Sequence, residues 1–479
     1  MNIKQAKQEI TNTLKAYLAK DQLGNYLIPT VRQRPVLLMG PPGVGKTQIM
    51  EQIAAETGVG LVAYTITHHT RQSAIGLPFI EKRTYGGEEV SVTEYTMSEI
   101  LSSVYRLMER TGLQEGILFL DEINCVSETL APMMLQFLQC KTFGNQALPE
   151  GWLIVAAGNP PEYNKSVRDF DVVTLDRVKR IDVEEDYGVW KEYARRKNLH
   201  GAILSYLDIK KDNFYRIENT ADGLQFATAR GWEDLSELLY AYETLGIRAD
   251  REVVGQYIQM PRIAKDFANY LEMFYKYQKT YHVEGILSGT WENITVLELR
   301  EAPFDEKLSV MGLVLSRLSE EARNTRRQDA LTDALHTSLT EFREKIADAP
   351  PLTVLDQLLW KRRTAMKQAK EAGQLDKESR DLKQREINVL EDYRQRLDRE
   401  AVAPEGAMDA VRGWFGEEVE RRKAMAMETK DMFDNAFRFL ETTFGDSQEL
   451  VIFVTEITAG YDTSWFVEQF GCDAYFRHN

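Results

Sequence analysis

The sequence predicts an α/β fold in which a parallel β-sheet core is followed by two mostly helical regions. Three continuous apolar runs, at residues 36–39, 116–120 and 152–157, are typical of parallel strands that are buried on both faces. From residue 184 onward, apolar residues recur mostly at three- and four-residue spacing, which indicates helices. We therefore expect three domains: an αβ core over residues 1–182, a helical lid over 183–300 and a mostly helical extension over 301–479.

The first apolar run leads into a loop of the form Gly-x-x-x-x-Gly-Lys-Thr, which is followed by a predicted helix at residues 48–56. Glycines allow the backbone to wrap around a phosphate, and the helix N-terminus adds the positive end of its dipole. Lys46 can reach the β- and γ-phosphates, and the Thr47 hydroxyl can ligate Mg²⁺. A glycine-rich turn without function is the alternative, but the strand before the loop and the helix after it favour a phosphate loop. We expect ATP and Mg²⁺ to be bound by this P-loop, which comprises Gly40, Pro41, Pro42, Gly43, Val44, Gly45, Lys46 and Thr47.

Two carboxylates, Asp121 and Glu122, follow the second apolar run. In open α/β sheets, ligands lie at the carboxyl ends of the strands, so both carboxylates would face the nucleotide. We expect Asp121 to hold Mg²⁺ through its water shell and Glu122 to polarise the attacking water as a general base. One carboxylate would serve binding alone, whereas two indicate hydrolysis. A strand end that carries two solvated acids is the alternative.

The third apolar run ends in Gly158-Asn159-Pro160. An amide at this strand end would orient the lytic water, although Gly-Asn-Pro is also ordinary turn chemistry. The place of Asn159 after the two earlier motifs favours the functional interpretation.

The order of these motifs resembles that of an AAA+ ATPase over residues 30–240. Residues 40–47 resemble the Walker A motif, residues 117–122 resemble Walker B, and Asn159 resembles sensor 1. The resemblance implies an oligomeric ring, most often a hexamer, in which neighbouring subunits share each active site.

Two arginines complete the resemblance. Arg177 lies in a Leu-Asp-Arg sequence similar to the one that carries the arginine finger in the MoxR and magnesium-chelatase branch, and Arg230 resembles sensor 2 at the start of a lid helix. Val178 stands where the family usually has phenylalanine, and Arg168 and Arg180 lie nearby, so the choice of finger among these three arginines stays open. For Arg177 and Arg230 alike, an ordinary surface ion pair is the alternative.

Two predicted hairpins favour the MoxR-like group. Residues 79–85 and 88–95 are β-type runs around Gly86-Gly87, which resembles the helix-2 insert of that group. Residues 141–150 resemble its pre-sensor-1 hairpin. Arg71 lies just after a further predicted strand, at residues 61–66, on the nucleotide side, so we also expect it to bind the nucleotide.

Composition limits the class of protein. Of 479 residues, 43% are hydrophobic and 28% charged, which is ordinary for a soluble chain with an ample core. The three cysteines show no metal-ligand or disulfide spacing. The chain opens on a polar helix rather than a signal peptide, and no apolar run is long enough to span a membrane, so we expect a cytoplasmic protein. The net charge of −15 disfavours non-specific binding of duplex nucleic acid.

The extension carries no residue set that suggests chemistry, so we expect it to contact partners or other subunits. Heptad spacing at residues 375–397 is short, which favours a helical hairpin over a long coiled coil. The last residues, 460–476, are rich in aromatic side chains, and we expect this tail to be docked as a short helix followed by an extended end. Docking onto the helical extension of the same chain is favoured, and docking on a neighbouring subunit or partner is the alternative.

Two classes of function are consistent with these features. The first is an oligomeric ATPase that remodels or matures a protein partner in a chaperone-like manner; the MoxR resemblance implies that this partner acts with a von Willebrand factor A-domain protein. The second is an AAA+ motor or regulatory subunit of a nucleic-acid-acting complex, for instance in restriction or defence. The acidic balance favours the first class. A third hypothesis, in which ATP serves only to hold an oligomer together, is weaker, because Glu122 would then have no role.

Overall fold

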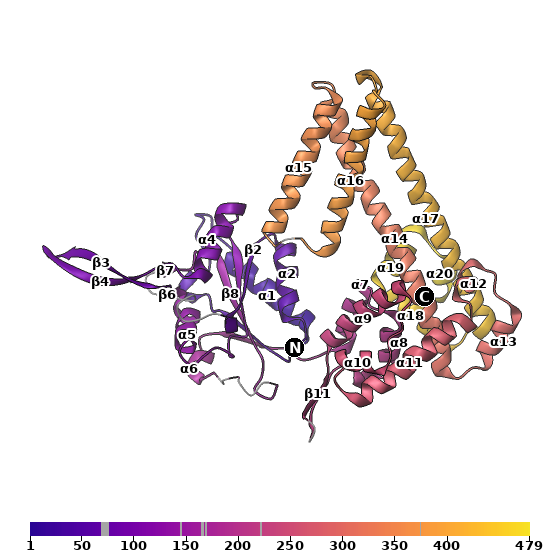
Figure 1. Ribbon diagram of the computed structural model, residues 1–479, viewed down its shortest axis with the longest axis horizontal. Helices are drawn as coiled ribbons and strands as arrows, with labels where there is room; N and C mark the ends of the chain where they lie inside the picture. The colour runs from indigo at the N-terminus through magenta and orange to yellow at the C-terminus, as the bar shows by residue number, and fades with distance from the viewer. Residues whose placement is uncertain (69–75, 144–145, 164–166, 168–169, 221–222, 374) are drawn as a thin grey trace. The chain divides into compact units, whose positions relative to one another are not determined.

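The computed structural model describes the whole chain except residues 69–75, 144–145, 164–166, 168–169, 221–222 and 374 (Figure 1). These residues form two compact units. The first unit holds residues 1–186 together with 363–380, and the second holds residues 187–362 together with 381–479. Of the site residues predicted from the sequence and described in the structure, only Arg230 lies in the second unit.

The first unit is built on a five-stranded sheet with the order β2-β5-β8-β1-β9. All neighbouring strands in it are parallel, so the predicted α/β fold with a parallel-sheet core is confirmed. Its strands are β1 (Val36–Met39), β2 (Gly60–Thr65), β5 (Gly116–Asp121), β8 (Trp152–Gly158) and β9 (Lys179–Asp182). The connections that leave the adjacent strands β1 and β8 run in opposite directions along the sheet, toward β2 and β9 respectively. Such a reversal marks the place where open α/β sheets bind ligands, outside the carboxyl ends of the strands.

Helices cover both faces of this sheet. Alternate residues of a strand point to opposite faces, so Leu38 and Phe119 join a core with α1 (Ile3–Leu18) and α2 (Lys46–Thr57). Leu37 and Leu118 join a second core on the other face. That second core is completed by two helices, α4 (Glu99–Thr111) and α5 (Ala131–Cys140). The central strands are therefore buried from both sides, which explains their uninterrupted apolar sequence.

Both predicted hairpins are present. β3 (Pro78–Tyr85) and β4 (Glu88–Tyr95) form an antiparallel ribbon that extends away from the sheet in Figure 1. Gly86 and Gly87 have φ values of 62° and 93° and make the two-residue turn between them, a conformation that glycine adopts without strain. The second hairpin pairs β6 (Thr142–Phe143) with β7 (Gln146–Ala147).

The second unit is mostly helical. Its first part contains a two-stranded hairpin, β10 (Arg216–Thr220) with β11 (Gly223–Ala227), which the sequence interpretation missed because its first strand is short and polar. The helices of this part are α7 (Tyr187–Arg196), α8 (Gly201–Ile209), α9 (Ala229–Leu245), α10 (Arg251–Tyr257), α11 (Pro261–Thr280), α12 (Val283–Ser288) and α13 (Asn293–Glu301). The later helices are α14 (Phe304–Lys345), α15 (Pro351–Glu371), α16 (Lys377–Arg399), α17 (Ala407–Phe444), α18 (Gln448–Ala459), α19 (Tyr461–Phe470) and α20 (Asp473–His478). Of these helices, residues 363–371 of α15 and 377–380 of α16 belong to the first unit.

One hydrophobic cluster runs through this unit, from Trp190 to Tyr475. The long helix α14 contacts α8 and α11 from the first part and α17 and α19 from the second. The aromatic side chains Tyr270, Phe274 and Tyr275 of α11 pack into this cluster, and Phe274 is only 4% exposed. The predicted boundary near residue 300 stays a prediction.

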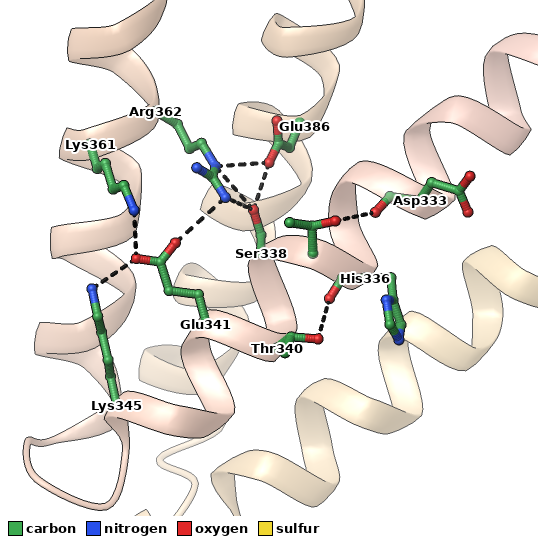
Figure 2. Close-up of polar contacts among 10 residues, drawn as sticks. Asp333, His336, Ser338, Thr340, Glu341, Lys345, Lys361, Arg362 and Glu386 are labelled. Carbon is green, nitrogen blue, oxygen red and sulfur yellow. Dashed lines mark hydrogen bonds and ion pairs between the residues drawn. The ribbon is translucent and has the colours of Figure 1, made fainter.

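A short connection joins α15 to α16, so the predicted helical hairpin is confirmed. Figure 2 shows the polar contacts that hold both helices to α14. The Arg362 guanidinium donates to the buried Ser338 hydroxyl of α14 at 3.1 Å and to Glu386 of α16 at 3.0 Å. One turn further along α14, Glu341 accepts hydrogen bonds at 2.8 Å from both Lys345 and Lys361.

The aromatic tail is docked within the chain, as predicted. Phe466 is fully buried and stacks on Phe433 of α17, with 5.1 Å between the ring centroids. Tyr475 is 7% exposed and lies in the same cluster. The prediction of an extended end is wrong, because residues 473–478 form the helix α20.

No helix in the described part of the chain is long and apolar enough to cross a membrane.

Candidate functional site

The P-loop lies between β1 and α2, at the carboxyl edge of the sheet. Gly43 and Gly45 have φ values of 77° and 93°, in the left-handed region that favours glycine. Gly45 is the residue directly before α2, so the loop ends where the free N–H groups and the positive dipole end of that helix are available. This backbone has the form that binds a phosphate.

Lys46 begins α2 and is 8% exposed. Its ammonium group donates to the carbonyl oxygens of Gly40 and Pro41 at 2.7 and 2.9 Å. It also donates to the Oδ1 atom of Asn159 at 2.8 Å. The structure therefore brings the P-loop lysine together with the amide that follows β8, although 113 residues separate them in the chain.

A second contact at this edge of the sheet joins Thr47 and Asp121. The Thr47 hydroxyl donates to Asp121 Oδ2 at 3.0 Å. The other oxygen of that carboxylate accepts from the backbone N–H of Glu122 at 2.9 Å. A hydroxyl and a carboxylate are oxygen ligands of the kind that Mg²⁺ prefers.

Glu122 stands directly after β5 in a left-handed conformation, with φ at 57°. A residue other than glycine rarely adopts this conformation, and such residues cluster at functional sites. Its carboxylate accepts a hydrogen bond from the Thr67 hydroxyl at 2.8 Å. Thr67 follows β2, the neighbour of β5 in the sheet. The sequence interpretation missed Thr67, although a polar residue directly after a predicted strand was a signal for it.

Asn124 is a second residue that the sequence interpretation missed. It is 3% exposed and bonds the backbone of Asn159 twice: its Nδ2 donates to the Asn159 carbonyl at 2.8 Å, and its Oδ1 accepts from the Asn159 N–H at 3.3 Å. No local sequence signal identifies this role, because the contact depends on β5 and β8 being neighbours in the sheet.

In the part of the chain that the structure describes, Arg177 is not hydrogen-bonded to Lys46, Asp121 or Asn159. It follows the short helix α6 (Val172–Leu175) and is exposed, and its guanidinium donates to the side chain of Gln139 on α5. Asp171 caps α6, and hydrogen bonds from Thr174 lower the pKa of the Asp171 carboxyl. Arg180, another candidate finger, bonds Asp182 at 2.8 Å.

The other predicted arginines lie elsewhere. Arg230 is exposed in the first turn of α9 in the second unit, where Thr228 caps the helix by accepting from the Gly231 N–H. Arg71 and Arg168 lie outside the described residues.

The side chains near the P-loop indicate whether a metal ion could bind there. The described residues contain no group of three or more His, Cys, Asp or Glu side chains that could hold a metal ion by themselves. Mg²⁺ usually keeps several waters and is held by one or two carboxylates together with substrate phosphates. The Thr47–Asp121 pair beside a phosphate-binding loop fits that mode of binding.

A cavity of about 430 Å³ lies at the carboxyl ends of β1, β8 and β9. Gly40, Asn124 and Tyr163 are among its lining residues, and burial raises the pKa of the Tyr163 hydroxyl. A larger cavity, of about 850 Å³, lies in the second unit and contains none of the predicted site residues. The smaller cavity is the one that adjoins the P-loop.

Comparison with known protein families agrees with this geometry. Residues 35–178 match the family model of the AAA domain of the dynein-related subfamily. The matched segment includes the P-loop, Asp121, Glu122, Asn159 and Arg177 but not Arg230. A comparison with curated proteins found no match. The parallel sheet and the P-loop agree with the family match, so residues 35–178 have the fold and the phosphate loop of an AAA domain.

Proposed function

We propose that this chain hydrolyses ATP in a Mg²⁺-dependent reaction and uses the energy to remodel a protein partner. One observation carries the catalytic part of this proposal. Side chains from the first turn of α2 and from the ends of the neighbouring strands β5 and β8 converge: Lys46 contacts Asn159, and Thr47 contacts Asp121. Glu122, in its left-handed conformation, lies directly beside Asp121.

Each of these groups has a role in the proposed reaction. Lys46 and the backbone N–H groups of the P-loop bind the phosphates and orient the γ-phosphoryl group for in-line attack. Thr47 and Asp121 would hold Mg²⁺, which would neutralise charge on the phosphate oxygens. Glu122 accepts a proton from the attacking water, and Asn159 orients that water. Because phosphoryl transfer depends mostly on positioning and charge, a rigid arrangement of these side chains accounts for catalysis.

Phosphate release measured with and without Mg²⁺ tests the activity itself. We expect hydrolysis that EDTA abolishes and excess Mg²⁺ restores. Lys46→Ala should weaken ATP binding, because it removes the cation that faces the phosphates. Lys15→Ala, on α1, is the matched control and should bind and hydrolyse ATP as the wild type does. A wild-type protein that binds ATP and never releases phosphate would overturn the catalytic proposal.

Assembly into a ring, which we take to be a hexamer, is the second part of the proposal. Arg177 is exposed, and the neighbouring apolar side chains Val172 and Val173 are 81% and 58% exposed. An arginine beside exposed apolar residues suits a subunit interface, in which it would stabilise transition-state charge on ATP held by the next subunit.

Mixing two inactive variants tests this arrangement. An Arg177→Ala subunit keeps Glu122, and a Glu122→Gln subunit keeps Arg177, so some interfaces of a mixed ring are complete and should recover hydrolysis. Arg106→Ala, at an exposed arginine of α4, serves as the matched control and should stay active without mixing. Full activity of Arg177→Ala alone, or of a strict monomer, would contradict a finger that acts between subunits.

The third part of the proposal concerns the kind of partner. The two hairpins β3–β4 and β6–β7 and the Leu-Asp-Arg sequence support a MoxR-like member of the AAA+ class, and such members imply a partner with a von Willebrand factor A domain. The large helical unit offers surface for protein contacts, and the net charge of −15 opposes phosphate-backbone binding. Capture of partners on the Glu122→Gln variant with ATP tests this part. Stimulation of hydrolysis by DNA or RNA, with no protein captured, would favour the nucleic-acid alternative.

A further inference from the structure

We infer that Asn124 is a positioning residue for hydrolysis: it fixes the backbone of Asn159 so that the Asn159 amide faces Lys46. This inference rests on the proposed ATPase function. It assigns a role to a residue that contacts neither the P-loop lysine nor the carboxylates in the described hydrogen bonds.

The contact between Asn124 and Asn159 is a closed pair of hydrogen bonds. Asn124 Nδ2 donates to the Asn159 carbonyl at 2.8 Å, and Asn124 Oδ1 accepts from the Asn159 N–H at 3.3 Å. The side-chain amide thereby bonds the peptide groups of Asn159 as a neighbouring strand would. Both groups of the amide are satisfied in only one orientation, so its rotation is fixed by the backbone that it contacts.

The surroundings of Asn124 restrict its movement. The residue is 3% exposed, and the preceding residue, Ile123, donates its backbone N–H to the Ala157 carbonyl at 2.9 Å. The loop after β5 is therefore bonded to the end of β8 at two successive positions. A side chain held at both its backbone and its amide has little freedom to drift.

Gly158 provides the space that this amide occupies. A Cβ atom at position 158 would lie 2.7 Å from Asn124 Oδ1 and 2.9 Å from its Cγ. These separations are shorter than van der Waals contact, so any larger residue would push the Asn124 amide away from Asn159. The glycine is required here for space and not for a left-handed backbone.

One further contact connects Asn159 to the P-loop lysine. Asn159 Oδ1 accepts from the Lys46 ammonium at 2.8 Å. Loss of the Asn124 bonds would free the Asn159 peptide, and the amide would lose its fixed position relative to Lys46. A displacement of about 1 Å in such a site can cost on the order of 10²-fold in rate.

Substitution of Asn124 separates this role from a general structural one. We expect Asn124→Ala to lower kcat roughly 10- to 100-fold, with the Kd for ATP changed by less than about 3-fold because the P-loop and Lys46 stay in place. Asn124→Asp keeps the acceptor for the Asn159 N–H but loses the donor to its carbonyl, so it should also lower kcat. Asn435→Ala removes a comparable amide-to-carbonyl bond, from Asn435 to Leu287 in the second unit, and should leave kcat unchanged.

A double-mutant cycle with Asn159→Ala gives the decisive readout. If Asn124 acts through Asn159, then adding Asn124→Ala to Asn159→Ala should lower kcat no further. Gly158→Ala should reproduce the Asn124→Ala defect, since it displaces the same amide.

The outcomes distinguish this inference from the proposed function. A wild-type protein without ATPase activity overturns both. An impaired Asn159→Ala combined with a fully active Asn124→Ala, or with additive losses in the double variant, overturns the positioning role and leaves the ATPase proposal standing. An Asn124→Ala protein that loses ATP affinity and folding stability in proportion to kcat would also overturn it, because that pattern indicates a structural role alone.

Discussion

Asp462 should make one of the largest single contributions to the stability of the helical unit. Its carboxylate is 3% exposed and pairs with two arginines of α14: Arg323 at 2.9 Å, and Arg326 at 2.8 Å. The Arg323 side chain is 9% exposed, so its charge is also shielded from water. Asp462→Ala would therefore leave a buried guanidinium without its carboxylate.

The expected cost follows from this burial. Removing one partner of a buried ion pair typically costs about 3–5 kcal/mol, mostly because the remaining charge is left uncompensated. We expect a value of about 3 kcal/mol, at the lower end of that range, because Arg326 is 16% exposed and can reach water. At roughly 2–4 °C per kcal/mol for a unit of this size, the thermal midpoint should fall by about 6–12 °C.

Thermal unfolding followed by circular dichroism measures this shift. The matched control is Asp473→Ala, an exposed aspartate in the first turn of α20, which should change stability by less than about 0.5 kcal/mol. If Asp462→Ala and Asp473→Ala melt at the same temperature, the buried ion pair does not stabilise the unit and the reasoning is refuted.

Two further predictions concern the same helical unit. Hydrogen bonds from Lys345 and Lys361 lower the pKa of Glu341 from 4.5 to about 2, so their stabilisation is complete above about pH 4.5 and is lost as the pH falls toward 2. Glu341→Gln should thus cost about 1 kcal/mol at pH 7, since both lysines are half-exposed, and urea unfolding should show this difference disappearing near pH 2; a difference that does not change with pH would contradict the assignment. Truncation after Ala459 removes Phe466 from its stack on Phe433, so we expect a lower melting temperature or insoluble protein, whereas an unchanged melting temperature would show that the tail is not part of the core.

The sheet was predictable where the strands are buried on both faces. β1, β5 and β8 are central, and burial on both faces explains their continuous apolar sequences. β9 lies at the sheet edge with Lys179, Arg180 and Asp182 in four residues, and its burial alternates, so the sequence gives little sign of a strand. The hairpin β10–β11 and the terminal helix α20 were missed for a similar reason: short elements owe their conformation to tertiary packing more than to their own sequence.

The candidate site was predictable as far as its motifs are local. The P-loop follows β1, Asp121 ends β5 and Glu122 follows it, and Asn159 follows β8, so their residue types and positions suffice. Thr67 contacts Glu122, and Asn124 contacts Asn159, across neighbouring strands. The position of Thr67 after a predicted strand was a signal for that residue, but only the strand order reveals which residues Thr67 and Asn124 contact. The roles of Arg177 and Arg230 stay predictions, because a finger that acts between subunits cannot be placed by one chain.

The most direct test of the central claim is ATP turnover by Glu122→Gln, with ATP binding measured on the same protein. The substitution keeps the shape of the side chain and its capacity to accept from Thr67, but it removes the base that would take a proton from water. We predict ATP affinity close to that of the wild type and a turnover rate lower by roughly 10²-fold or more. Turnover at the wild-type rate would contradict the assignment of Glu122 as the catalytic base and, with it, the proposed mechanism.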